Sequence, residues 1–161
     1  MSHNFQTFVV PYDFSEHSRA ALRMATDLAQ RFESDLHLVH VIQSLSLAYA
    51  AYGGPGTAAA APVAMLELRE VAESALRGVA AEVENECASV QMHVVESAGI
   101  PDAICEVAAK VGADLIVMGT HGRTGLAHAF LGSVAERTLR RSPCAVLTVR
   151  APAAAEPAAG A

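Results

Sequence analysis

Short runs of apolar residues alternate along this chain with longer stretches in which apolar residues recur every three or four positions. A short apolar run rich in branched side chains is typical of a buried strand, whereas the longer spacing is typical of a helix that packs through one face. The pattern predicts five strands, at residues 8–12, 35–41, 89–95, 115–118 and 144–149. Between them it predicts four helices, at residues 15–32, 65–83, 100–111 and 133–141. Such regular alternation is typical of an open, mostly parallel α/β sheet with helices on both faces.

Individual residues mark some of the predicted boundaries. Pro101 suits the first turn of its helix, and Gly112 suits the residue that ends the same helix. Residues 89–95 alternate apolar and polar side chains, so we expect this strand to have a wetter face and to lie near the edge of the sheet.

Two stretches interrupt the regular pattern. Residues 42–62 are rich in Ala and Gly, and a loop of this length in a compact domain is either functional or disordered. Residues 151–161 consist mainly of Ala and Pro, and we expect them to be disordered because they lack large apolar side chains. Residues 1–150 are therefore expected to form one domain.

The charge balance narrows the classes of partner. The net charge is −6, and Lys110 is the only lysine in the chain. An acidic surface of mixed charges argues against nucleic acid or an anionic membrane as the main partner. No apolar run approaches the roughly 20 residues of a membrane span, and the N-terminus lacks a signal-peptide pattern, so we expect a cytoplasmic protein. The three cysteines lack a CxxC pair, and we expect them to be reduced and mostly buried.

The stretch at residues 113–137 combines a buried strand, a glycine-containing loop and the start of a helix. Its glycines, Gly119, Gly122 and Gly132, have the spacing G-x2-G-x9-G, and Ser133 follows the last of them. Glycines allow the backbone to approach an anion closely, and a helix N-terminus directs backbone N–H groups at it. The spacing therefore predicts a phosphate site.

Ser133 has a second interpretation that needs no ligand. Ser133 and Glu136 have the spacing S-x-x-E of a capping box, in which the two side chains bind the backbone N–H groups of their own helix. Both interpretations stay open, because a helix N-terminus can accept an anion beside its own cap.

A Walker-type loop is excluded because the glycine loop contains no Gly-Lys-Ser/Thr sequence. Backbone N–H groups, the helix N-terminus, Arg123 and a divalent cation are then left to neutralise the phosphate charge.

Asp13 follows the first predicted strand and is the second polar candidate. It either caps the first helix, with Ser15 as the competing cap, or contacts a ribose hydroxyl or a phosphate-bound metal ion. Val41 ends the second predicted strand and could flank a purine ring. His121 and His128 are expected to be solvated, and no set of carboxylate, histidine and nucleophile is visible, so we predict no catalytic residues.

The residues that surround these candidates resemble the universal stress protein family. The resemblance covers residues 5–150 and rests on GTHGRTGLAHAFLGSVAERTLRRSPCAVLTVR, on VVPYDFSEHSRAAL, on LHLVHV and on GIPDAICEVAAKVGADLIVMG. The insert at residues 43–62 and the segment after Arg150 depart from it.

The resemblance implies a flavodoxin-like three-layer sheet of order 3-2-1-4-5 and a homodimer that pairs through the last strands. It also implies the branch of the family that binds ATP together with Mg²⁺ or Mn²⁺. By position, Asp13 would lie near the ribose and the metal, and Val41 near the adenine. Gly119 and Gly122 would lie near the phosphates and ribose, and Gly132 and Ser133 near the outer phosphates. Pro11 and Met118 would line the pocket.

These inferences lead to one main hypothesis, an ATP-binding regulatory stress-response protein whose bound nucleotide biases dimer or partner interactions. Two alternatives stay open. One is a slow ATPase, against which the lack of a placed base or lysine argues, and the other is a structural dimerisation module with an empty pocket.

Overall fold

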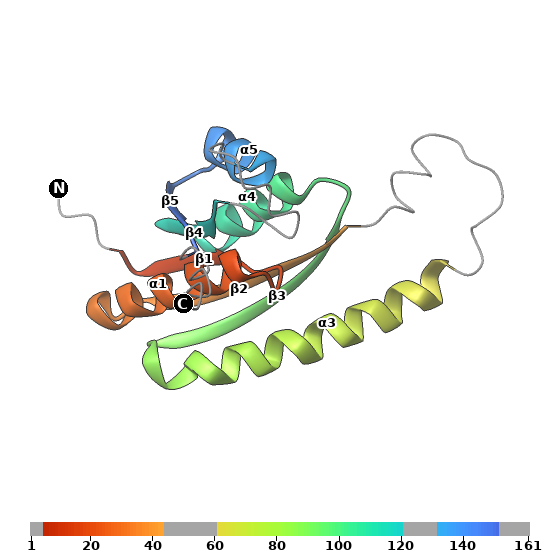
Figure 1. Ribbon diagram of the computed structural model, residues 1–161, viewed down its shortest axis with the longest axis horizontal. Coiled ribbons are helices and arrows are strands. Elements are labelled where there is room, and N and C mark those ends of the chain that lie inside the picture. The colour runs from red at the N-terminus through yellow and green to blue at the C-terminus, as the bar shows by residue number, and fades with distance from the viewer. Residues whose placement is uncertain (1–4, 44–60, 121–131, 152–161) are drawn as a thin grey trace, which may run out of the picture.

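The computed structural model describes residues 5–43, 61–120 and 132–151, and Figure 1 shows their arrangement. The elements follow in the order β1 (Thr7–Pro11), α1 (Glu16–Phe32), β2 (Asp35–Gln43), α3 (Ala61–Val83), a short 3₁₀ turn (Glu84–Glu86), β3 (Ser89–Ser97), α4 (Ile100–Val111), β4 (Leu115–Gly119), α5 (Ser133–Arg141) and β5 (Ala145–Val149).

The five strands form one sheet of order β3-β2-β1-β4-β5, and every pair of neighbours is parallel. The predicted fold class and strand order are therefore confirmed. Val9 of β1 pairs with His37 of β2 on one side and with Ile116 of β4 on the other. The strand order thus reverses between β1 and β4. In parallel sheets of this kind, ligands bind at the carboxyl ends of the two strands at the reversal.

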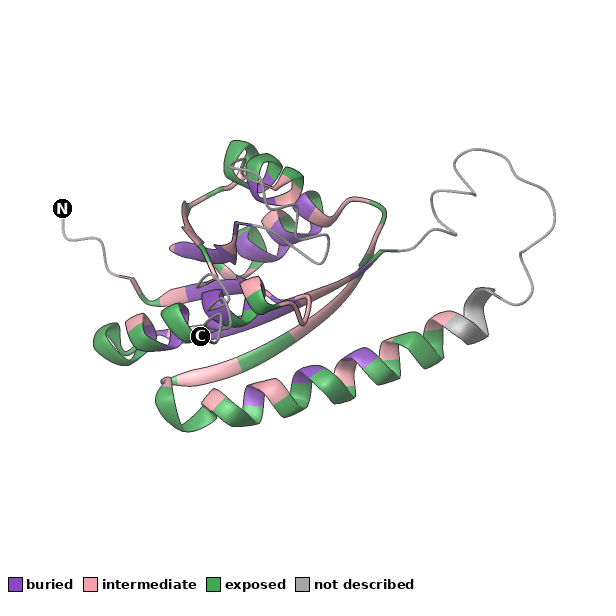
Figure 2. Ribbon diagram, in the orientation of Figure 1, coloured by how far each residue is buried: buried purple, intermediate pink, exposed green. Residues whose placement is uncertain are grey.

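Helices cover both faces of the sheet, and each face has its own apolar core. One core joins α1 and α3 to alternate strand residues such as Phe8 and Leu38, both fully buried. The other joins α4 and α5 to the intervening residues, including Val9 and Ile116. Figure 2 shows the buried residues concentrated in the central strands and on the inner faces of the helices.

Several predicted boundaries agree with the structure. Gly112 ends α4 in the left-handed conformation with φ +67°, and Pro101 lies in the first turn of that helix. Strand β3 lies at the edge of the sheet, as its alternating pattern predicts. Among the described residues, no helix combines the length and apolar character needed to cross a membrane.

Other expectations need correction. Strand β2 continues two residues beyond Val41, because residues up to Gln43 pair with β3, and α3 begins at Ala61 rather than at Met65. The stretch predicted as a loop is shorter at both ends, and residues 44–60 lie outside the described part of the chain. The three cysteines are free but only half-buried, which corrects the expectation that they would be mostly buried. The segment after Ala151 also lies outside the described residues.

Candidate functional site

Apolar side chains line the carboxyl end of the sheet on the face that α4 and α5 cover. Val41 and Met118 both pack against the core on this face, and Met118 is buried. Pro11 ends β1 two residues beyond Val9, so strand alternation directs it to the same face. Pro11 and Met118, predicted to line a pocket, therefore share one side of three adjacent strands with Val41, predicted to lie near the adenine.

The turn from β1 to α1 carries Asp13. Its carboxylate oxygen Oδ1 accepts a hydrogen bond from the Ser15 N–H at 3.0 Å, while Ser15 is the N-cap of α1 and accepts from the Ser18 N–H at 3.2 Å. Of the two capping possibilities, Ser15 is thus the cap. The Asp13 carboxylate thus lies between the end of β1 and the first turn of α1.

Phe14 has an unusual backbone conformation within this turn. Its φ is +66°, in the left-handed region that side chains with a Cβ rarely adopt. Its ring meets the Tyr12 ring edge-on with centroids 5.2 Å apart and lies 5.0 Å from the His40 ring. The β1–α1 turn is therefore held by aromatic packing across β1 and β2.

Gly119 ends β4 directly beside the N-terminus of α1. A Cβ added to Gly119 would lie 2.8 Å from the Cβ of His17 and 2.9 Å from its backbone C and O atoms. Contacts this short do not occur between real Cβ atoms and a backbone, so close packing of helix on strand explains the glycine. Among the described glycines only Gly112 has a positive φ, so chain reversal does not explain Gly119.

Thr120 joins three elements at the start of the glycine loop. Its N–H donates to the carbonyl oxygen of Val149 in β5 at 2.9 Å, and its carbonyl oxygen accepts from the Gly132 N–H at 2.7 Å. Thr120 and Gly132, which flank residues 121–131, are therefore in direct contact.

Helix α5 begins with Ser133, and Gly132 is its N-cap without a side-chain hydrogen bond. The capping box predicted for Ser133 and Glu136 is therefore wrong, because Ser133 already lies in the first helical turn and its side chain is exposed. The Glu136 N–H donates to the Gly132 carbonyl oxygen at 2.9 Å and so begins the helical ladder. The preceding N–H groups, of Ser133, Val134 and Ala135, have no acceptor within the helix, and this end of α5 carries the positive end of the helix dipole.

Two predicted site residues, Gly122 and Arg123, lie outside the described residues. The sole lysine, Lys110, lies in the last turn of α4, at the opposite end of that helix from Gly99. Burial is the larger cause that lowers the pKa of the His93 imidazole in β3, and the positive charge of Lys110 lowers this pKa further. No group of three metal-ligating side chains occurs in the described ranges.

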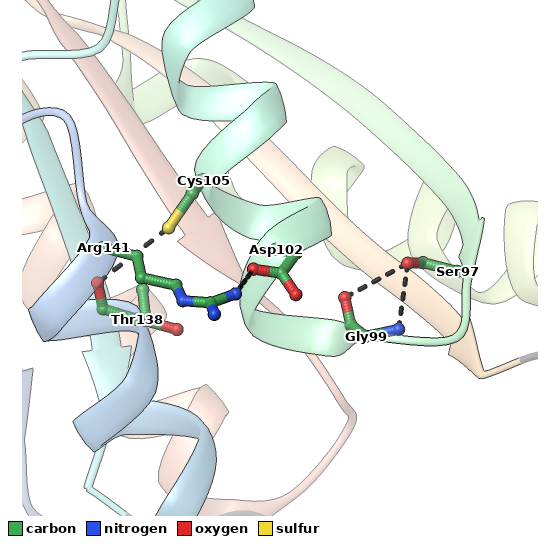
Figure 3. A network of polar contacts seen from close by, with 6 residues as sticks. All are labelled: Ser97, Gly99, Asp102, Cys105, Thr138 and Arg141. Carbon is green, nitrogen blue, oxygen red and sulfur yellow. Dashed lines mark hydrogen bonds and ion pairs between the residues drawn. The ribbon is translucent and has the colours of Figure 1, made fainter.

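A shallow hollow of about 370 Å³ lies elsewhere, and Asp102, Cys105, Glu106, Ala109, Arg141 and Pro143 line it. Figure 3 shows the polar contacts at this place, including the ion pair of Arg141 with Asp102 and the Cys105 thiol directed at the Thr138 carbonyl oxygen. Burial is the largest cause that raises the pKa of Cys105, so the thiol is a weak nucleophile. These contacts join α4 to α5, and we assign them a structural role.

Sequence reasoning missed three residues of this end of the sheet: Phe14, His17 and Thr120. Strained backbone at an aromatic residue has no sequence signature, and the contact of His17 with Gly119 joins distant parts of the chain. Thr120 lies inside the glycine motif, but its buried position between β5 and α5 depends on the sheet order.

A five-stranded parallel sheet of order 3-2-1-4-5 between two helical layers defines a flavodoxin-like α/β protein. Residues 4–150 match the family described as the Universal stress protein family, and the chain belongs to it. Universal stress protein MJ0531 of Methanocaldococcus jannaschii is 34% identical over 149 residues, which cover 92% of this chain and 84% of that protein.

Solved structures show the same fold. The structure of the protein MJ0577, which is a universal stress protein of the same archaeon, superimposes with a TM-score of 0.79 at 25% identity and covers 93% of this chain and 99% of that chain. A universal stress protein in complex with cAMP superimposes with a TM-score of 0.56 at 26% identity and covers 92% of this chain and 98% of that chain.

Proposed function

We propose that this protein binds ATP at the carboxyl ends of β1, β2 and β4 and acts as a regulatory stress-response protein. The nucleotide-bound state would differ from the empty state in dimer shape or in the choice of a protein partner. The first turn of α5 is the observation that carries the proposal. Three successive N–H groups there have no acceptor within the helix, and they lie directly after the hydrogen bond between Gly132 and Thr120.

Two sets of described residues support a site for the base and the phosphates of an adenine nucleotide. Pro11, Val41 and Met118 offer an apolar wall to the base. The N-terminus of α5, at Gly132 and Ser133, offers N–H groups to the outer phosphates. The cAMP-bound relative supports an adenine nucleotide as the class of ligand.

Asp13 is the residue that would hold Mg²⁺ or Mn²⁺ with the nucleotide, or accept a hydrogen bond from the ribose. Magnesium commonly keeps several waters and binds proteins through one or two carboxylates together with substrate phosphates. One carboxylate at the end of β1 fits that requirement. The metal would supply charge neutralisation that a lysine supplies in Walker-type sites, and Lys110 lies outside this site.

Isothermal titration of the nucleotide-free protein with ATP and excess Mg²⁺ tests the proposal. We expect one ATP per chain with a Kd below millimolar, and parallel titration with GTP tests base selection by the apolar wall. Saturation at 100 times the Kd would add about 2.7 kcal/mol to the free energy of unfolding. An unchanged melting temperature and no binding heat at millimolar ATP would instead support a structural module with an empty pocket.

We also propose a homodimer that pairs through β5. Among the described residues, strand β5 has a neighbouring strand only on its β4 side, and its apolar residues Val146, Leu147 and Val149 are only half-buried in the single chain. A second copy paired along β5 would cover them and remove an exposed edge. Analytical ultracentrifugation of the full chain tests this; a monomer at every concentration would contradict it.

A further inference from the structure

The turn between β1 and α1 contains a left-handed backbone conformation that is unfavourable for a residue with a Cβ. Phe14 and Glu33 are the non-glycine residues with positive φ in the described part of the chain. Glu33 caps the C-terminus of α1, where a left-handed residue is common. Phe14, with φ +66°, instead precedes the N-cap of α1, so its conformation needs another source of stability.

Contacts from two strands supply that stability. The Tyr12 N–H donates to the Val39 carbonyl oxygen at 2.8 Å, and the Tyr12 carbonyl oxygen lies 2.7 Å from Nδ1 of His40. A carbonyl oxygen only accepts, so Nδ1 of His40 carries the proton and donates. This bond fixes the imidazole against which the Phe14 ring packs at 5.0 Å, while the Tyr12 ring packs against Phe14 from the strand at 5.2 Å. We call Tyr12, Phe14 and His40 the aromatic clamp.

The aromatic clamp lies next to the one carboxylate assigned to the site. Asp13 is enclosed in sequence by Tyr12 and Phe14, and its Oδ1 is committed to the Ser15 N–H at 3.0 Å. The direction of the Asp13 side chain therefore depends on the backbone of Phe14. Loss of the ring would release the strained conformation and with it the fixed position of the carboxylate.

We propose that Phe14 is a positioning residue for nucleotide binding: the aromatic clamp holds its left-handed backbone, and this backbone directs Asp13 at the ribose or at the metal ion on the phosphates. The inference rests on the proposed function. Phe14 touches no ligand in this scheme and acts through Asp13 alone. Preorganisation of this kind raises affinity because the loop is ordered before the ligand arrives.

A double-mutant cycle on the full-length protein tests the coupling. We expect Phe14→Ala to weaken ATP binding in the presence of Mg²⁺ by about tenfold, as expected for residues that act through one contact. Phe14→Tyr keeps the ring and should restore the wild-type Kd. Asp13→Asn should weaken binding as well, and the double variant should bind no more weakly than Asp13→Asn alone. Losses that multiply in the double variant, or a wild-type Kd for Phe14→Ala, would overturn the proposal.

Two further variants separate positioning from stability. Phe14→Gly removes the ring but adopts positive φ without strain, so it should fold even where Phe14→Ala does not, and it should still lose affinity. Phe5 belongs to an aromatic group at the opposite end of β1, with its ring centroid 5.5 Å from that of Phe32. Phe5→Ala should lower the melting temperature and leave the Kd for ATP unchanged. Equal losses of affinity in Phe5→Ala and Phe14→Gly would make the clamp a stability element only.

Amide hydrogen exchange gives a readout that needs no nucleotide. Ser15 and Ser18 form the capped first turn behind Asp13, and their amide protons should exchange faster in Phe14→Ala and at the wild-type rate in Phe14→Tyr. A wild-type protein that binds no ATP would refute the proposed function, while unchanged exchange in Phe14→Ala would separately refute the clamp.

Discussion

Gly119 and His17 pack so closely that the end of β4 leaves no room for a side chain beside the first turn of α1. The nearest atoms belong to the backbone and the Cβ of His17, which cannot rotate away. The glycine motif thus begins with a residue whose smallness serves helix packing, whatever further role it has toward a ligand.

Replacement of Gly119 by Ala should therefore destabilise the fold. We expect a loss of about 1–3 kcal/mol in the free energy of unfolding, because overpacking forces the α1 backbone to shift. Urea denaturation measures it. Gly78→Ala is the matched control, since nothing lies within 4 Å of its added Cβ in the middle of α3, and it should stabilise by about 0.5–1 kcal/mol. Equal stability of the two variants would refute the packing argument.

Replacement of Gly132 by Asp should separate stability from binding. Gly132 has φ −59° and ψ 150°, which any residue adopts, and it occupies the N-cap of α5 without a capping side chain. Asp is preferred over Gly at the N-cap, so we expect the variant to gain roughly a few tenths of a kcal/mol of stability without ligand. Its carboxylate would repel phosphate, so the rise in melting temperature on addition of ATP should disappear. A variant that keeps this rise would contradict the phosphate site at α5.

The stability of the protein should decrease as the pH falls below about 6.5, the ordinary pKa of histidine. Nδ1 of His37 and Nε2 of His93 lie 2.9 Å apart, so one ring donates to the other. Burial lowers the pKa of both residues; His93 lowers that of His37 further, against a smaller opposing effect of Asp35, and Lys110 lowers that of His93. At acidic pH the unfolded chain therefore binds more protons than the folded chain. The stability present above pH 6.5 is lost as the pH falls from 6.5 toward the lowered pKa values of the folded protein.

The variant with His37→Gln and His93→Gln tests this pH dependence, because two amides keep a hydrogen bond but do not titrate. Thermal unfolding between pH 5 and 8 should show a flatter profile for the double variant than for the wild type. Lys110→Gln removes one of the charges that act on His93 and should reduce the loss at low pH in part. A wild-type profile in the double variant would assign the acid sensitivity to other groups.

The ion pair of Arg141 with Asp102 should contribute little to stability despite its place between α4 and α5. The side chains are 62% and 49% exposed, and exposed ion pairs contribute about 0–1 kcal/mol. Arg141→Gln should therefore lower the free energy of unfolding by less than about 1 kcal/mol, and salt should reduce the difference further. A loss of several kcal/mol would indicate that this contact anchors α5.

Most of the fold follows from local patterns. Apolar runs such as residues 8–12 and 115–118 indicate buried strands, and Gly112 and Pro101 mark helix ends through their own backbone limits. The strand order follows from the family resemblance and not from periodicity. The sequence does not locate the first residue of α3, because Ala and Gly around position 61 give no apolar periodicity that marks a boundary.

The candidate site was less predictable because its details depend on contacts between distant residues. Asp13 and Gly132 were identified from their places after a strand and before a helix. The spacing of Ser133 and Glu136 is that of a capping box, yet the helix begins one residue earlier than a Ser133 cap requires, since Gly132 takes the cap position. Nothing local predicts that Phe14 adopts a left-handed conformation, because that conformation is stabilised by His40 of the next strand.

The hydrogen bond between Thr120 and Gly132 has a consequence for how this chain tolerates change. Because the two residues meet, the connection between them can gain or lose residues without altering the distance that it must span. Insertions and deletions at residues 121–131 should therefore be better tolerated by the fold than changes that remove this hydrogen bond. The fold should therefore constrain the length of this connection only weakly, and any constraint on its residues would come from the ligand.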